Sequence, residues 1–291
     1  MSTISVRMGR LSTARRKKVA GASWLRYVVY PLLALIVFTV VFGPMLISSD
    51  ANTSHIVDAL QAPSAQHWLG TDDQGRDVLA RVVLGARVSV SASLAIVVGF
   101  STIGVLVATI ATVGGKWVDE VVMRIVDGVL AIPPIIFALG AAAALGPSLQ
   151  SAIIAMSLTG WPYTARLLRG IMRETASTNY VEGARVLGVS KARLMFKHVL
   201  PNSLEVMVVK WAGDLGNTIL ILGALSFVGV GAQPPSAEWG AAIVASKGDL
   251  ATAWWPAFAP GVAIAIAAIT FGLLGDMLQA RFNPDLGVSR G

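Results

Sequence analysis

Few side chains in this sequence could carry out covalent or metal chemistry. There are three histidines, His55, His67 and His198, and there is no cysteine. A first-row metal site usually gathers several His, Cys or carboxylate ligands, and no cluster here has ligand spacing. The Gly-Gly-Lys-Trp run at 114–117 lacks the spacing and the hydroxyl of a phosphate-binding loop, and no protease or hydrolase motif is present. The sequence therefore predicts no catalytic residue, no metal site and no ATP site in this chain.

Ionisable residues inside or near the apolar stretches are the other candidates, because charge within a membrane marks a functional site by default. Two pairs have helical pairing spacing, so we expect paired structural roles rather than a proton relay. They are Arg124 with Asp127 and Lys210 with Asp214. Three further arginines share one helical face and are expected to anchor lipid headgroups. These are Arg166, Arg169 and Arg173.

The elements that must position these residues follow from an apolar composition. Hydrophobic residues make up 55% of the 291 residues and charged residues only 13%, with a mean hydropathy of +0.69. A soluble domain carries about 25% charged residues. The chain is therefore predicted to be an integral membrane protein. Its net charge of +7 does not indicate a nucleic-acid partner, because the basic residues follow a membrane-topology pattern.

Six stretches are apolar over the roughly 20 residues that a spanning helix needs. The predicted fold class is an all-α membrane protein with about six transmembrane helices. The adjacent prolines at 133 and 134 fall in the third stretch, where we expect a kink. The six stretches are Val28–Ile47, Val88–Val113, Val121–Leu145, Leu149–Leu168, Val206–Val230 and Trp255–Leu278.

Lysine and arginine positions predict the orientation. The first 28 residues are basic without an acidic residue, and the apolar run that follows is longer than that of an ordinary secretory signal. We therefore expect a basic cytoplasmic tail at 1–27, a first span at 28–47 and an extracytoplasmic loop with an amphipathic helix at 48–87. A five-helix core at 88–280 would contain a cytoplasmic loop at 169–204, and residues 281–291 would form a second cytoplasmic tail.

The cytoplasmic loop has local signals for two short helices. Asn179 can cap the first helix, and Gly188 suits the left-handed position that ends it. Ser190 can cap the second helix, which Pro201 is expected to stop, and Asn202 can then cap the fifth span. Such a knob cannot bury its own apolar residues, so we expect a partner groove for them. They are Val181, Val186, Leu187, Leu194, Met195 and Phe196.

The spacing in this loop resembles the EAA loop of ABC importer permeases, Glu-Ala-Ala-x3-Gly-x9-Ile-x-Leu-Pro. Gly183 replaces the first alanine, and His198 takes the isoleucine position, where histidine is common in the peptide-permease branch. The resemblance implies a coupling helix that docks in a groove on a separate ATPase subunit. The residues it assigns to this coupling are Glu182, Gly183, Ala184, Arg185, Leu187, Gly188, His198, Leu200 and Pro201.

The outer segment from His67 to Arg81 is similar to the His-x-Leu-Gly-Thr-Asp-x-x-Gly-Arg-Asp segment of the C-type permease in dipeptide, oligopeptide and nickel importers. From the residues alone, Thr71 should cap an amphipathic surface helix and Asp77 should pair with Arg81. Two roles stay open: contact with the substrate-binding protein or shaping of the outer mouth, and a structural brace. The residues concerned are Gly70, Thr71, Asp72, Gly75, Arg76 and Asp77.

With the six-span layout, the resemblance covers about residues 28–280 and identifies a permease subunit of the oligopeptide branch, with the type I importer fold, in the bacterial inner membrane. It implies a homologous second permease, two ATPase subunits or one double ATPase, and an extracytoplasmic binding protein or lipoprotein. ATP and Mg²⁺ would be bound by the ATPase partners, so no cofactor is expected in this chain. Dipeptides or oligopeptides are the expected cargo.

Three alternatives stay open from the sequence. The same family also imports nickel and other small solutes. A secondary transporter would work without an ATPase, and it would leave the spacing of residues 182–201 unexplained. A membrane enzyme would need a catalytic constellation, which the sequence does not show.

Overall fold

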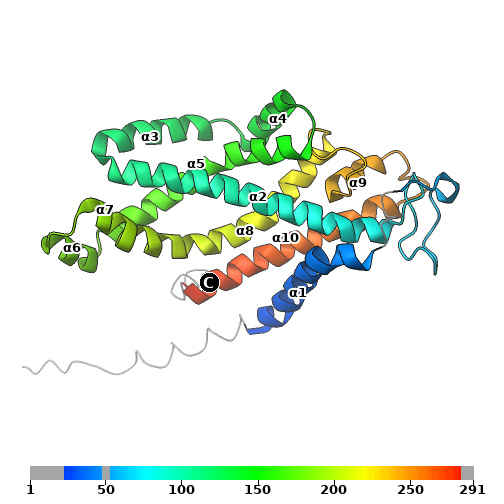
Figure 1. The fold of residues 1–291 in the computed structure, drawn as a ribbon, viewed down its shortest axis with the longest axis horizontal. Coiled ribbons are helices and arrows are strands. Elements are labelled where there is room, and N and C mark those ends of the chain that lie inside the picture. Colours follow the sequence, from blue (N-terminus) through cyan, green and yellow to red (C-terminus); the bar gives the residue numbers. More distant parts are fainter. Residues whose placement is uncertain (1–22, 48–52, 283–291) are drawn as a thin grey trace, which may run out of the picture.

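The computed structural model describes residues 23–47 and 53–282, and this part of the chain is helical without a β-strand (Figure 1). The predicted tails fall mostly outside it. The helical structure of the described residues confirms the predicted all-α fold class. The helices are α1 (Ser23–Leu46), α2 (Val78–Val113), α3 (Gly115–Leu130), α4 (Pro134–Leu145), α5 (Leu149–Ala176), α6 (Asn179–Val186), α7 (Lys191–Leu194), α8 (Leu200–Phe227), α9 (Trp239–Ala245) and α10 (Trp255–Phe282), with a 3₁₀ turn at Ile56–Asp58 and a π-helical turn at Met195–Val199.

Fewer helices qualify as membrane spans than the six stretches predicted. Among the described residues, four continuous helical segments are long and apolar enough to cross a membrane, and the bent pair of α3 and α4 makes up to five. The remaining predicted stretch lies in α5, where Gln, Ser, Thr and Arg interrupt the apolar residues. The four segments are Leu25–Leu46, Val78–Val113, Lys191–Phe227 and Trp255–Arg281.

The third predicted span is not one helix. α3 ends at Leu130 and α4 begins at Pro134, and their axes differ by 84°. Pro133 is extended, with φ −55° and ψ 125°, because a residue that precedes proline avoids the helical region. Pro134 can start a helix, since its missing N–H would have no partner there. The expected kink is therefore a sharp break that turns α4 across the bundle.

Small residues set the closest helix contacts. Gly104 on α2 lies against α5, where an added Cβ would come within 2.6 Å of the Thr164 Cβ. Gly216 on α8 faces α10, where an added Cβ would come within 2.6 Å of the Ala268 carbonyl oxygen. Such positions let membrane helices approach closely. These contacts join α2 with α5 and α8 with α10 into the body of the bundle.

The arginines on α5 contact acidic side chains of α3, and the sequence analysis did not predict these contacts. Both carboxylate oxygens of Asp119 contact Arg169, and one of them also contacts Arg173. Arg166 contacts Asp127, which replaces the predicted pair of Asp127 with Arg124. The partners lie 39 to 54 residues apart in the chain, so helical spacing could not reveal them. We call these contacts the α3–α5 clamp.

Replacing Asp119 by asparagine is expected to loosen the α3–α5 clamp. The change removes the charge that Arg169 and Arg173 contact, and a hydrogen bond to a charged group contributes about 1.5–3 kcal/mol. Because Arg173 is about half exposed, we expect a total near the lower end of that range. Thermal unfolding in detergent should show a lower midpoint for Asp119→Asn. The exposed neighbour provides the control: Glu120→Gln should leave the midpoint unchanged. Equal midpoints for the two variants would contradict the clamp.

Candidate functional site

The predicted coupling loop forms a compact knob, residues 179–199, at the end of the bundle opposite the 53–77 loop (Figure 1). One face of the knob is buried. Val181 and Leu194 are 1% and 5% exposed, and they belong to a cluster with Leu168 of α5 and Met207 of α8. This root cluster therefore joins the knob to two long helices, α5 and α8.

A glycine turn reverses the chain at the tip of the knob. Gly188 has a φ of +83°, in the left-handed region that glycine enters without a steric penalty. Its N–H donates to the Arg185 carbonyl at 3.0 Å, and the Val189 N–H donates to the Ala184 carbonyl at 3.2 Å. This pair of bonds is the Schellman ending of a helix. The prediction that Gly188 ends the first helix is confirmed.

The two helix starts in the knob differ in how well the sequence predicted them. Ser190 caps α7 as expected, and its hydroxyl accepts from the Arg193 N–H at 3.4 Å. The cap of α6 is Thr178, so Asn179 lies inside the helix and its predicted capping role was wrong. The Thr178 hydroxyl does not cap either, because it donates back to the Thr175 carbonyl at 2.6 Å.

The second knob helix does not stop at Pro201, contrary to the prediction. The π-helical turn Met195–Val199 leads directly into α8, and Pro201 lies in the first turn of α8. Proline is tolerated there because the adjoining π-helical turn adjusts the backbone hydrogen bonds that its missing N–H would interrupt. Asn202 is consequently inside α8 and does not cap it. α7, the π-helical turn and α8 are therefore one continuous helical segment, Lys191–Phe227.

A polar link that the sequence analysis missed ties α6 to the start of α8. The Tyr180 hydroxyl donates to the His198 carbonyl at 3.2 Å. The Asn202 side-chain amide donates to the same carbonyl at 2.7 Å and to the Tyr180 hydroxyl. The Tyr180 and His198 rings also lie 6.3 Å apart between centroids. The link joins α6 to the start of α8 across the turn at Gly188.

The other face of the knob presents apolar side chains to the surroundings. Val186, Leu187 and Phe196 are 83%, 85% and 59% exposed, and we call these three the exposed tip. The other apolar residues for which a partner groove was expected, Val181, Leu194 and Met195, are buried in the root cluster. Of the remaining predicted coupling residues, Glu182, Gly183, Arg185, Gly188 and Pro201 are exposed, and Ala184, His198 and Leu200 are half-buried.

The outer segment does not contain the separate amphipathic helix that was predicted. α2 begins at Val78, so residues 78–87 form its first turns rather than part of an outer loop. The cap is Asp77, whose carboxylate accepts from the Ala80 N–H at 2.8 Å. Thr71 is not a cap. Asp77 was a more suitable residue for this role, because it directly precedes the apolar run of α2.

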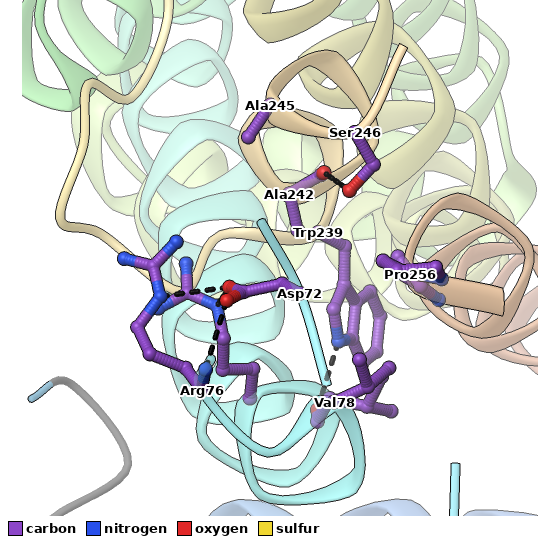
Figure 2. Close-up of a pocket in the computed structure, with 11 residues that line it drawn as sticks. Asp72, Arg76, Val78, Trp239, Ala242, Ala245, Ser246 and Pro256 are labelled. Atoms are coloured by element: carbon purple, nitrogen blue, oxygen red, sulfur yellow. Dashed lines mark hydrogen bonds and ion pairs between the residues drawn. The ribbon is translucent and has the colours of Figure 1, made fainter. Parts of the chain in front are cut away.

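Three charged residues form a buried group that we call the polar latch, two of which are labelled in Figure 2. The Asp72 carboxylate accepts from Arg76 Nε at 2.7 Å and lies 3.5 Å from Arg81 Nε. All three side chains are at most 7% exposed. Arg81 also donates to the Ser236 carbonyl at 3.0 Å, so its predicted pair with Asp77 is replaced. The latch connects the outer loop, α2 and the segment before α9.

Thr71 fastens the outer loop to α10. Its side chain is buried, and its hydroxyl donates to the Asp58 carbonyl and accepts from the Gln61 N–H at 2.8 Å. Its carbonyl accepts from the Trp255 indole N–H at 3.1 Å. Gly70, with a φ of +73°, lies so close that an added Cβ would come within 2.5 Å of that indole nitrogen. Glycine is therefore required at this contact.

α9 is joined to α2 by side chains that sequence analysis did not identify. Glu238 is 1% exposed, caps α9 through the Ala241 N–H at 2.8 Å, and accepts from the Ser89 hydroxyl at 3.2 Å. The Trp239 indole donates to the Val82 carbonyl at 2.9 Å (Figure 2). These partners are 149 to 157 residues apart, so local spacing gives no signal for them.

Burial in the outer segment favours a structural brace. Of the six family-pattern residues there, only Asp77 is half-buried, and the other five are buried. A partner protein would find the exposed side chains of Val57 and Trp68 more accessible, since they are 98% and 72% exposed.

Two ionisable residues in α8 were correctly paired from their spacing. Lys210 and Asp214 form an ion pair, and each side chain is 24% exposed. They line a cavity between the helices. Within the described residues, no three His, Cys, Asp or Glu side chains gather closely enough to hold a metal ion.

Known proteins match the sequence of this chain over most of its length. The pattern of the family described as binding-protein-dependent transport system inner membrane component matches residues 101–288. A probable D,D-dipeptide transport system permease protein of Escherichia coli is 37% identical over 88% of this chain and 86% of its own. A dipeptide transport system permease protein of Alkalihalophilus pseudofirmus is 36% identical over 88% and 84%. A putative peptide permease protein of Brucella suis is 34% identical over 87% and 84%.

Proposed function

The chain belongs to the family of binding-protein-dependent transport system inner membrane components, and on that premise we propose its role. It is a multi-pass inner-membrane permease subunit of an ABC importer for peptides, as the names of its relatives and its apolar helices support. The transport step is movement of cargo through the bilayer, and the chain itself catalyses no covalent reaction in this account.

The coupling proposal rests on one observation: the knob is packed on α5 and α8 through the root cluster, and its exposed tip is left uncovered. Leu187 and Val186 are more than four-fifths exposed, although their neighbour Val181 is almost completely buried. Full burial of one such side chain contributes about 1.5–3 kcal/mol. A docking groove on an ATPase subunit would supply that burial. The knob therefore acts as the coupling element on the cytoplasmic side of the membrane.

The route from the knob to the spans is continuous. The knob passes without a break into α8 and packs on α5 through the root cluster. When ATP closes a pair of ATPase subunits, the docked knob would move with them and shift the cytoplasmic ends of both helices. α5 and α8 also line the cavity between the helices, so this motion would change access to it. Alternating access follows from this linkage.

The partners complete the proposal. A homologous second permease would share the cargo path, and two ATPase subunits, or one double ATPase, would bind ATP and Mg²⁺. An extracytoplasmic binding protein or lipoprotein would deliver the cargo. The polar latch and the contacts of Thr71 would keep the outer surface in one shape for that delivery.

ATPase stimulation in the reconstituted complex tests the cargo assignment. The complex in lipid, supplied with its binding protein, should hydrolyse ATP faster with di- or oligopeptides than without cargo. Peptides of increasing length would show whether the cargo is dipeptides or oligopeptides. Nickel provides the contrasting cargo: stimulation by nickel alone would keep the coupling mechanism and overturn the peptide assignment.

A further inference from the structure

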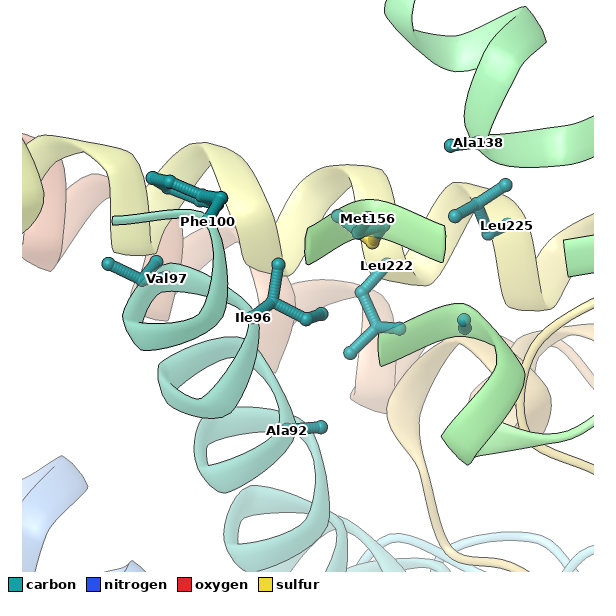
Figure 3. Close-up of a cluster of buried hydrophobic side chains, with 9 residues drawn as sticks. Ala92, Ile96, Val97, Phe100, Ala138, Met156, Leu222 and Leu225 are labelled. Carbon is teal, nitrogen blue, oxygen red and sulfur yellow. The ribbon is translucent and has the colours of Figure 1, made fainter. Parts of the chain in front are cut away.

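A cavity of about 400 Å³ opens between α2, α4, α5 and α8. Small-molecule sites commonly measure about 300–1,000 Å³, so this space can hold a short peptide. One side of the cavity is apolar and is formed by Ile96, Phe100, Ala138 and Met156, which belong to the buried cluster drawn in Figure 3. The opposite side is α8, whose lining residues are polar except for Ile221.

The polar residues follow one face of α8. Lys210, Asp214, Asn217 and Thr218 are spaced at i, i+4, i+7 and i+8, and all four line the cavity. At 1.5 Å per residue they extend over about 12 Å of the helix axis, close to the roughly 10 Å length of an extended tripeptide. Polar and charged groups are costly within a membrane segment and usually face a substrate path.

The ion pair of Lys210 and Asp214 can be replaced by ion pairs with a cargo that carries both charges. Lys210 contacts Asp214, and its ammonium lies 5.7 Å from the centre of the Phe100 ring, within the range of a cation–π contact. Within the cavity the two charges pair with each other, which avoids the large penalty of an unpaired charge in the membrane. A zwitterion brings one charge of each sign. Its entry can therefore replace the internal pair with two new pairs and leave no charge unmatched.

From this geometry we infer that Lys210 and Asp214 form a cargo subsite for the charged ends of a short peptide. Lys210 pairs with the α-carboxylate and Asp214 with the α-ammonium, and the polar side chains further along α8 offer hydrogen bonds to the peptide main chain. The inference rests on the proposed transport of peptides. It adds the residues that distinguish a free peptide from a capped one on its way through the membrane.

Uptake of free and capped peptides tests the subsite. Uptake of a free tripeptide, its C-amidated form and its N-acetylated form would be measured for the wild-type complex. The same three rates would be measured for the Lys210→Gln, Asp214→Asn and double variants. Dividing each variant rate by the wild-type rate removes the preference of the binding protein. Free-peptide uptake should fall about tenfold in each single variant, the change expected for loss of one hydrogen bond to a charged group. Lys210→Gln should spare the amidated peptide, and Asp214→Asn should spare the acetylated one.

The controls separate the subsite from a purely structural ion pair. Glu205→Gln removes an exposed charge from the same helix and should leave all three rates unchanged. A structural pair would lower the three rates equally in each variant, and that result would overturn the inference. Wild-type complex that takes up no peptide at all would instead overturn the proposed function.

Cysteine labelling provides a second test that does not depend on the charged variants. The natural chain has no cysteine, so a single introduced thiol reports its own position. Asn217→Cys in the cavity should react with a hydrophilic thiol reagent, and peptide-loaded binding protein should slow that reaction. Leu220→Cys is the control. Its side chain lies on the face of α8 that is exposed outside the bundle, within the membrane, where a hydrophilic reagent does not enter, so it should react slowly under both conditions. No labelling at 217 would mean that the second permease fills the cavity, and labelling that cargo does not slow would mean that peptides pass elsewhere. Either result would overturn the inference.

Discussion

Replacing Leu187 by aspartate is expected to abolish ATP-driven uptake while the chain remains folded in the membrane. Leu187 is 85% exposed, so the substitution removes almost no contact within the chain. A carboxylate would have to enter the docking groove without a partner, and an unpaired buried charge costs several kcal/mol. Uptake and recovery of the ATPase subunits with the purified permease would both be measured, and both should fall by more than about tenfold.

A conservative change at the same position provides the control. Leu187→Met keeps an apolar side chain of similar volume, so it should retain most of the uptake. Leu194→Asp is the opposite case, because Leu194 is buried in the root cluster and its replacement should lower the amount of folded protein. Normal uptake by the Leu187→Asp variant would rule out docking through the exposed tip.

The second large effect is expected at the polar latch. Asp72→Asn should lower the free energy of unfolding by about 3–5 kcal/mol, the usual cost of removing one partner from a buried ion pair. Arg76 and Arg81 would both remain buried and charged without their shared carboxylate. Thermal unfolding of the purified protein and its level in the membrane are the measurements.

The adjacent carboxylate provides the comparison for the latch, because Asp73 Oδ1 lies farther from Arg76, 3.8 Å from Nη2, and its side chain is 35% exposed. Burial, reinforced by the neighbouring Asp72 carboxylate, raises the pKa of Asp73. A charge that its surroundings disfavour can be removed with little loss, so Asp73→Asn should be nearly neutral for stability. Similar losses in the two variants would show that the latch does not depend on the Asp72 charge.

Local chemistry explains which parts of the site could be predicted from the sequence. Gly188 and Ser190 each form a hydrogen bond with a residue three positions away, so their roles are visible in the spacing alone. The i,i+4 pair of Lys210 and Asp214 is local in the same sense. The failure at Pro201 has a different cause. A π-helical turn and the first turn of a helix both tolerate its missing N–H, and the sequence offered no sign of the turn.

Contacts between distant segments explain the other differences. Thr71 was expected to cap a helix, but its hydroxyl is used by Asp58 and Gln61 of the same outer loop. The α5 arginines also contact acidic side chains of α3, which the chain brings alongside α5 when it reverses direction after α2. The cavity beside Lys210 likewise needs four helices. Hydropathy predicted most of the apolar helices, and it could not predict how their polar residues meet.

The most direct test of the account is uptake of a labelled short peptide into liposomes that contain this permease, its homologous partner and the ATPase subunits. The account predicts accumulation that requires ATP, the binding protein and an intact exposed tip. Uptake that continues when the ATPase subunits are omitted would contradict it, and would identify the chain as a secondary transporter.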